Sequence, residues 1–251
     1  MMSQALILRA YLKEAKYECI RALRSPGFAF PFLVLPAALY LLFGVLLFGD
    51  AAKQDPNTPL YLFTGFATFG AMGPGMFGFG IFVALEREQG LLNLKRALPM
   101  PPAAYLVAKM SMAVLFTAIV MATMIGSAAA IVHLRLNAGQ FATVALVFIF
   151  GALPFCAIGL FIGTRASGKA APALVNLLYL PMIYLSNILI PLPQSLQWIA
   201  RASPAAYLDL LALRAMGGPA LGAPIVVDVA VLCGVTVLLM MLSARRLVRV
   251  G

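Results

Sequence analysis

The chain has 251 residues, of which 63% are hydrophobic and 10% are charged, and its formal net charge is +10. Its mean hydropathy of +0.99 lies far above that of a soluble domain. This composition predicts an all-α membrane protein with room for six transmembrane helices of roughly 20 residues and for no added soluble domain. The positive charge does not indicate a nucleic-acid partner, because the basic residues stand at the ends of apolar runs.

The residue types that most often mark metal sites or covalent frameworks are sparse. Cys19, Cys156 and Cys233 are far apart and lie in or beside apolar stretches, so they predict neither a disulfide framework nor a metal site. His133, the only histidine, stands at a span boundary and is assigned no chemistry. The N-terminus lacks a short apolar core followed by a small-residue cleavage site, so no cleaved signal peptide is expected.

The first segment, residues 3–24, is too polar to cross a bilayer. Its apolar residues recur at spacings of three and four and leave the basic residues on other faces; they are Leu8, Leu12, Ala15, Cys19 and Leu23. This pattern predicts an amphipathic interfacial helix at the membrane surface. A soluble helix packed on a partner is the alternative.

Six apolar runs then predict six membrane spans, at residues 28–48, 60–85, 106–132, 141–162, 171–192 and 225–242. Small residues in the second run, Ala67, Ala71 and Gly75, share one face at a spacing of four, and Gly159 and Gly163 repeat that spacing in the fourth run. The pattern indicates close contact between helix backbones. A flexible second run that bends is the alternative.

Residues 193–214 are amphipathic and are broken at Ser203-Pro204, so they predict a re-entrant or surface helical segment on the outer face. Asp209 and Arg214 stand at a spacing that allows an ion pair, although a solvated pair is the default. Asp228, near the start of the last span, looks isolated.

The distribution of Lys and Arg predicts the orientation. With both termini cytoplasmic, fourteen of the eighteen basic residues fall in inner segments, and only Lys53, Arg135, Arg201 and Arg214 fall outside. This bias matches the positive-inside rule and an even number of spans. We therefore expect a multi-pass protein of the cytoplasmic (inner) membrane.

The inner loop at residues 86–105 has the most unusual pattern in the chain. It begins with Glu86, Arg87 and Glu88, after which Gly90 ends the incoming helix. A short helical piece at residues 91–98 follows and is closed by Pro99. The loop either fixes orientation through its charges or offers a docking surface to a soluble partner.

This loop resembles the first cytoplasmic loop of ATP-binding cassette (ABC) type-2 permeases. The resemblance rests on E-R-x-x-G-x-L, on L-x-x-x-L-P and on a later Lys, which fall at Glu86, Arg87, Gly90, Leu94, Leu98, Pro99 and Lys109. The family usually has Thr or Ser before the Pro or near the Gly, whereas this chain has Leu98 and Leu91. The resemblance extends over nearly the whole chain, from the first helix to the segment before the last span.

The resemblance implies the membrane subunit of an exporter. Two permeases, expected to be a homodimer, would join two ABC ATPase subunits, and the loop would carry a coupling helix that docks on the ATPase. The residues implied in coupling are Glu86, Arg87, Glu88, Gly90, Leu91, Leu94, Leu98 and Pro99. The chain itself would catalyse nothing and hold no cofactor, because ATP and Mg²⁺ belong to the partner. The substrate would be a hydrophobic or amphipathic drug, antibiotic or lipid.

Two further patterns bear on this function. Gly163 to Lys169 fits the spacing of a phosphate-binding loop, but Ala170 replaces the required Ser or Thr and no buried strand precedes it, so ATP binding is not expected here. Asn176, Tyr179, Ile183 and Asn187 recur on one face of the fifth span. That face predicts a translocation path or a dimer seam, or else simple hydrogen bonding between helices.

Two other classes of function stay open. An unenergised channel or a scaffold of a membrane complex would need no ATPase partner. An intramembrane enzyme would need a nucleophile with a base, or a metal cluster, inside the spans, and the single histidine argues against that.

Overall fold

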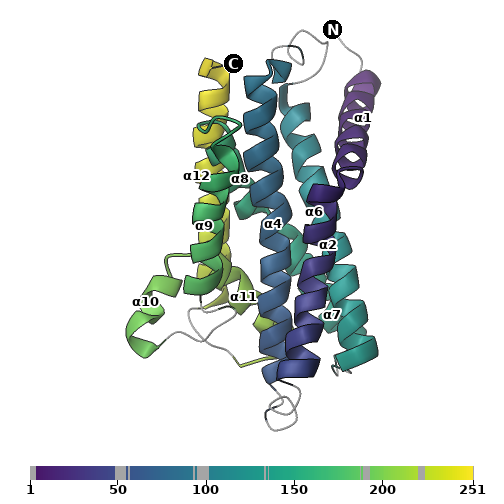
Figure 1. Ribbon diagram of the computed structural model, residues 1–251, viewed down its shortest axis with the longest axis vertical. Helices are drawn as coiled ribbons and strands as arrows, with labels where there is room; N and C mark the ends of the chain where they lie inside the picture. The colour runs from purple at the N-terminus through teal and green to yellow at the C-terminus, as the bar shows by residue number, and fades with distance from the viewer. Residues whose placement is uncertain are drawn as a thin grey trace.

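The computed structural model describes residues 4–48, 55, 57–92, 94, 102–132, 134, 136–186, 188, 193–219 and 224–250. Throughout these residues the regular structure is helical, as predicted. The chain begins with α1 (Gln4–Leu23), which leads through Ser25 into α2 (Pro26–Leu41) and a π-helical end, η1 (Leu42–Leu47). Figure 1 shows most of the helices side by side in one elongated bundle, with both chain ends at the same end of it.

The remaining elements follow in chain order. They are α4 (Thr58–Glu88), α6 (Pro102–Ser127) with η2 (Ala128–Val132), α7 (Ala138–Gly151), α8 (Leu153–Gly163), α9 (Ala171–Leu185), η3 (Gln194–Leu196), α10 (Gln197–Ala200), α11 (Pro204–Ala215) and α12 (Ile225–Val250).

Five helical stretches of the described chain are long and apolar enough to cross a membrane. They are Pro26–Leu47, Thr58–Glu88, Ala104–Val132, Ala138–Gly163 and Ile225–Leu247. The fifth predicted span is represented by α9, whose 15 residues rise roughly 22 Å, short of a hydrocarbon core of roughly 30 Å. The structure thus supports a multi-pass membrane protein, while the count of six spans stays a prediction.

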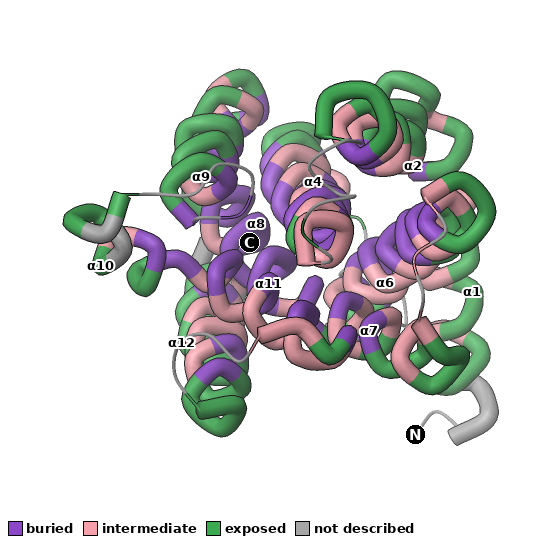
Figure 2. Tube along the Cα trace, turned by 90° about the horizontal axis from the view of Figure 1, so that it is seen from below, coloured by how far each residue is buried: buried purple, intermediate pink, exposed green. Residues whose placement is uncertain are grey.

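The second membrane helix, α4, is the axis of the bundle. Of the most apolar 18-residue stretch of α4, 72% of the residues are buried within the chain. The corresponding share is 17% in α2–η1 and 6% in α12. Figure 2 shows α4 in the middle of the other helices, with the exposed faces of α2 and α12 turned outward. In a membrane those outward apolar faces would meet lipid or another protein, whereas α4 is covered by its own chain.

Glycines allow α8 to lie directly against α4. A Cβ atom on Gly159 would stand 2.7 Å from the backbone oxygens of Gly75 and Met76, and one on Gly163 would stand 2.8 Å from that of Phe79. Contact this close between two helix backbones requires residues without side chains. The close packing predicted from the small residues is therefore confirmed for Gly75, Gly159 and Gly163.

The fourth span is bent, which the sequence analysis did not predict. α7 ends at Gly151 and α8 begins at Leu153, with Pro154 in its first turn, where a missing N–H costs little. Leu208 of α11 packs against the bend, since a Cβ on Gly151 would stand only 2.2 Å from the Cδ1 atom of Leu208. Helix α11 thus packs against the bend.

The first helix packs on α6 through one face and leaves another uncovered. Glu18 and Ala22 are buried, while Leu8, Leu12 and Leu23 of the predicted apolar face are 60%, 62% and 41% exposed. The chain itself therefore does not cover these leucines. Their contact with the membrane surface stays a prediction, and so does the interfacial position of α1.

Candidate functional site: the charged end of α4

Three consecutive charged residues, Glu86, Arg87 and Glu88, form the last turn of α4. The helix continues three residues beyond the predicted end of the second span, so these side chains project from a rigid helix. It ends at Gly90, whose φ of +71° is a left-handed conformation that favours glycine. Glu86 turns toward α1 and α6, whereas Arg87 and Glu88 turn toward the segment between α8 and α9.

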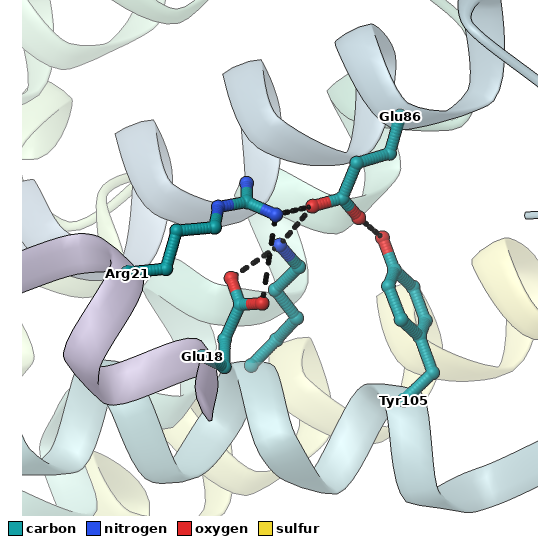
Figure 3. A network of polar contacts seen from close by, with 5 residues as sticks. Glu18, Arg21, Glu86 and Tyr105 are labelled. Atoms are coloured by element: carbon teal, nitrogen blue, oxygen red, sulfur yellow. Dashed lines mark hydrogen bonds and ion pairs between the residues drawn. The ribbon is translucent and has the colours of Figure 1, made fainter. Parts of the chain in front are cut away.

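Glu86 lies in a cluster of five polar residues that we call the Glu86 cluster, comprising Glu18, Arg21, Glu86, Tyr105 and Lys109 (Figure 3). The ammonium group of Lys109 donates to Glu18 at 2.5 Å and to Glu86 at 2.8 Å. The Tyr105 hydroxyl donates to the other oxygen of Glu86 at 2.7 Å. Arg21 also donates to Glu86 and stands 3.7 Å from Glu18.

Three charged side chains of the cluster are buried, and its charges balance. Lys109 is 0%, Glu86 3% and Glu18 4% exposed at the side chain, while Arg21 reaches outward. Two carboxylates face two cations, so the group as a whole carries no formal charge. Burial of ions is costly, and the loss of one partner leaves a buried charge uncompensated at about 3–5 kcal/mol. The cluster therefore fixes α1, α4 and α6 relative to one another.

Arg87 and Glu88 bind the turn between α8 and α9. The Arg87 guanidinium donates to the backbone oxygens of Thr164 and Ala166, and a Glu88 oxygen accepts from the amide of Gly168 at 2.9 Å. Arg246 of α12 donates to the same Thr164 oxygen at 3.1 Å. Through these bonds the end of α4 is tied to α8, α9 and α12.

The turn bound in this way is the segment that resembled a phosphate-binding loop. Its Gly168 amide is engaged by a carboxylate, and its Gly163 is pressed against the backbone of α4. A Cβ on Gly168 would stand 2.3 Å from the Glu88 carboxylate oxygen, so glycine is needed for this contact. The two glycines therefore have a structural explanation inside the chain that requires no nucleotide.

Of residues 91–101, the structure describes Leu91, Leu92 and Leu94, all helical. Leu92 is buried beside Val83 and Tyr105, whereas Leu94 is 63% exposed. Leu91 is half-buried. The predicted coupling residues Leu98 and Pro99 lie outside the described residues.

The residues of the predicted polar face of α9 lie in different surroundings, some buried and one exposed. Tyr179 is buried and donates to the Phe69 oxygen of α4 at 3.1 Å, and Ile183 is buried in the main core. Asn176 is exposed and bonds back to the Pro172 oxygen of its own helix at 3.1 Å. Asn187 lies outside the described residues. Tyr179 and Ile183 thus pack within the chain, while Asn176 remains on an open surface.

A second buried ion pair lies at the opposite end of the bundle. Arg214 of α11 bonds Asp228 of α12 at 2.9 Å, and the Asp228 side chain is 0% exposed. The view of Asp228 as isolated is therefore wrong: its partner is Arg214, 14 positions earlier. Asp209 is instead buried next to α4, where burial raises its pKa to about 7 despite a hydrogen bond from Thr64.

Three members of the Glu86 cluster, Glu18, Arg21 and Tyr105, were not identified from the sequence. A usable signal was present for Glu18, which is one of two acids in a helix otherwise rich in basic residues. Arg21 follows it at a spacing of three, which is a helical pairing distance. Tyr105 gave no signal, because an aromatic residue at a span boundary usually marks the interface.

Several membrane-crossing helices locked together by a buried ionic cluster define an integral, multi-pass membrane protein. The particular family follows from comparison with known proteins. The model of the ABC-2 type transporter family matches residues 13–209, which is most of the chain, so the protein belongs to this family and is a transport permease. A similar protein is "Putative transport permease YvfS" of Bacillus subtilis (strain 168), 26% identical over 234 residues that cover 92% of this chain and 94% of the relative.

Proposed function

We propose that this chain is the membrane subunit of an ATP-driven exporter and that the charged end of α4 transmits movement from a separate ABC ATPase to the spans. The observation that carries the proposal is the set of bonds made by Glu86, Arg87 and Glu88. One helix end is joined to α1 and α6 through the Glu86 cluster, and to α8, α9 and α12 through the turn after Gly163.

Force applied beside this end would reach most of the bundle at once. Leu94, four residues after Gly90, is exposed, so it is accessible to a partner. Leu92, two residues earlier, is buried against Tyr105 and α4, so a push on this segment acts on the core rather than on a free loop. Glu86 is too buried to touch a partner, and its part in coupling would be indirect, through Lys109 and Tyr105.

The rest of the proposal follows the same family mechanism. Two ATPase subunits would hold ATP and Mg²⁺, and two copies of this chain would form the path, with both termini and the end of α4 on the cytoplasmic side of the inner membrane. A hydrophobic or amphipathic substrate is consistent with the exposed apolar surfaces of α2, α9 and α12. Asn176, on the open side of α9, is the described residue that we assign to the path or the dimer seam.

Co-purification tests the partner directly. The tagged chain should carry with it a protein that hydrolyses ATP. Leu94→Asp should remove most of that ATPase, because a charge would be buried against the partner without a counterion. Leu94→Met is the matched control and should retain it, since it keeps an apolar side chain of similar volume. Equal ATPase recovery from the two variants would show that Leu94 is not a docking residue.

A further inference from the structure

An apolar groove lies between the bent fourth span and the last helix. Its cavity measures about 490 Å³, within the range of roughly 300–1,000 Å³ typical of ligand pockets. One wall is formed by Leu146 and Phe150 of α7 with Pro154 of α8, the other by Cys233 and Val237 of α12. The groove exists because α12 packs on α8 and α11 while α7 packs on α6 and α11, so the two helices diverge beyond the bend.

The groove belongs to the half of the bundle away from the Glu86 cluster. Arg246, near the far end of α12, reaches Thr164 beside Arg87, whereas the lining residues of α12 lie between Val229 and Val237. The Arg214–Asp228 ion pair comes directly before Val229. Charged groups therefore stand at one end of the groove, and only apolar surface continues from there toward the middle of the membrane.

The lining offers almost no hydrogen-bonding capacity to an occupant. The hydroxyl of Thr143 donates to the Gly139 oxygen at 2.8 Å, and that of Thr236 donates to the Leu232 oxygen at 2.7 Å, so both are turned onto their own helices. Polar groups placed here would lose their partners at a cost of several kcal/mol in an apolar medium. Whatever fills the groove must therefore be hydrocarbon along its length.

The dimensions favour a chain over a helix. The lining extends over roughly 12–16 Å of helix rise, about half of the roughly 30 Å that a membrane-crossing helix would occupy. An empty slot would forfeit the dispersion contacts of all its lining atoms. In a membrane, the slender hydrocarbon that is always present is a lipid tail.

We propose that this groove is a binding site for one acyl chain of a membrane phospholipid, with its headgroup beyond the end marked by Arg214 and Asp228. The bound chain completes the packing between α7 and α12 where the protein's own side chains leave space. The groove shares no residue with α9 or with the segment around Leu94 that we propose to dock on the ATPase. The lipid site therefore does not depend on the proposed ATPase coupling.

Photolabelling with a defined lipid tests the site. The protein is reconstituted with phosphatidylcholine that carries a diazirine midway along one acyl chain, extracted in detergent, washed and irradiated, and the labelled residues are mapped. Label should concentrate on the groove walls, at Leu146, Phe150 and Cys233, and not on Leu238 or Met241, which are exposed apolar residues of α12 outside the groove. Even labelling along all exposed faces of α12 would overturn the proposal.

Variants that fill the groove provide the matched comparison. Cys233→Trp, or Leu146→Trp from the opposite wall, should remove most of the retained label, whereas Leu238→Trp should leave it unchanged. Unchanged labelling in both filled variants would contradict the site. Mild oxidation tests a rival occupant: a disulfide that joins two copies through Cys233, absent in Cys233→Ala, would show that a second copy covers the groove and would overturn the lipid proposal.

Discussion

Glu86 and Lys109, 23 positions apart on α4 and α6, meet at 2.8 Å in a site that excludes water. Both stand at positions that resemble the type-2 permease motif, and the structure explains their separation in sequence. Glu86 precedes residues 91–101 at the end of α4, and Lys109 follows them in α6, so one residue from each side of that segment takes part in the same ion pair. Movement of that segment must therefore either strain this pair or carry α4 and α6 with it.

Removing the central cation should destabilise the bundle. Lys109→Met leaves the buried Glu18 and Glu86 with only Arg21, and we expect a loss of about 3–5 kcal/mol, seen as a lower thermal midpoint in detergent. Lys16→Met is the matched control, because Lys16 is exposed on α1. If both variants unfold at the wild-type temperature, the cluster does not hold α1, α4 and α6 together.

The contact between α4 and α8 should tolerate no side chain at Gly159. Gly159→Ala places a methyl group 2.7 Å from backbone oxygens of α4, which cannot move aside as a side chain can, and overpacking of this kind costs about 1–3 kcal/mol. Gly126→Ala on α6 and Gly234→Ala on α12 meet nothing within 4 Å and should be neutral or stabilising, because Ala favours a helix over Gly by up to about 1 kcal/mol. Thermal unfolding of the three variants measures the difference; equal midpoints would refute the close contact.

Arg87 should hold the turn after α8 through its planar guanidinium group, whose two nitrogens donate to two backbone oxygens. Arg87→Lys keeps the charge but offers one ammonium group where two backbone oxygens, of Thr164 and Ala166, are now bound. We expect faster hydrogen exchange at Arg165 to Lys169 in this variant. Arg24→Lys, at an exposed residue that follows α1, should leave that exchange unchanged. Exchange in Arg87→Lys that equals wild type would mean that Arg87 does not order the turn.

Asp209 should make stability depend on pH. Burial raises its pKa from 3.8 to about 7, with Thr64 and Tyr61 of α4 facing it. A raised native pKa means that the protonated form is favoured on folding, so its stabilising effect is complete below pH 4 and is lost as the pH rises through 7. Asp209→Asn should therefore be more stable than wild type above pH 7 and should flatten the profile between pH 4 and 7. A parallel profile in both proteins would show that Asp209 does not titrate in this range.

Much of the fold could be predicted from the sequence, because a helix that crosses a membrane must be apolar over most of its length. The long runs around α4, α6 and α12 and the glycine contacts at Gly159 and Gly163 were accessible in this way. The bend at Gly151 was not, because α7 and α8 form one uninterrupted apolar run. The fifth span stays a prediction, since the helix at this position, α9, ends at Leu185 with Ser186 as its C-cap.

The site was predicted only in part, because its contacts join distant segments. Glu86, Arg87 and Glu88 stand out as charges at a helix end, but their partners at Arg21, Thr164 and Gly168 follow from the three-dimensional path alone. The pairing of Arg214 with Asp228 rather than Asp209 has the same cause: helical spacing is local, and the observed pair joins two helices.

The most direct test of the central claim separates docking from coupling. Leu178, exposed on α9, is replaced by a single cysteine in a chain whose Cys19, Cys156 and Cys233 are changed to Ala. Its thiol reactivity is measured with and without ATP in the complex with the co-purified ATPase, and we expect an ATP-dependent change when the Glu86 cluster is intact. Glu86→Gln, which keeps the shape of the side chain but removes its charge, should retain the ATPase and lose most of that change. An ATP-dependent change of wild-type size in Glu86→Gln would contradict transmission through the Glu86 cluster.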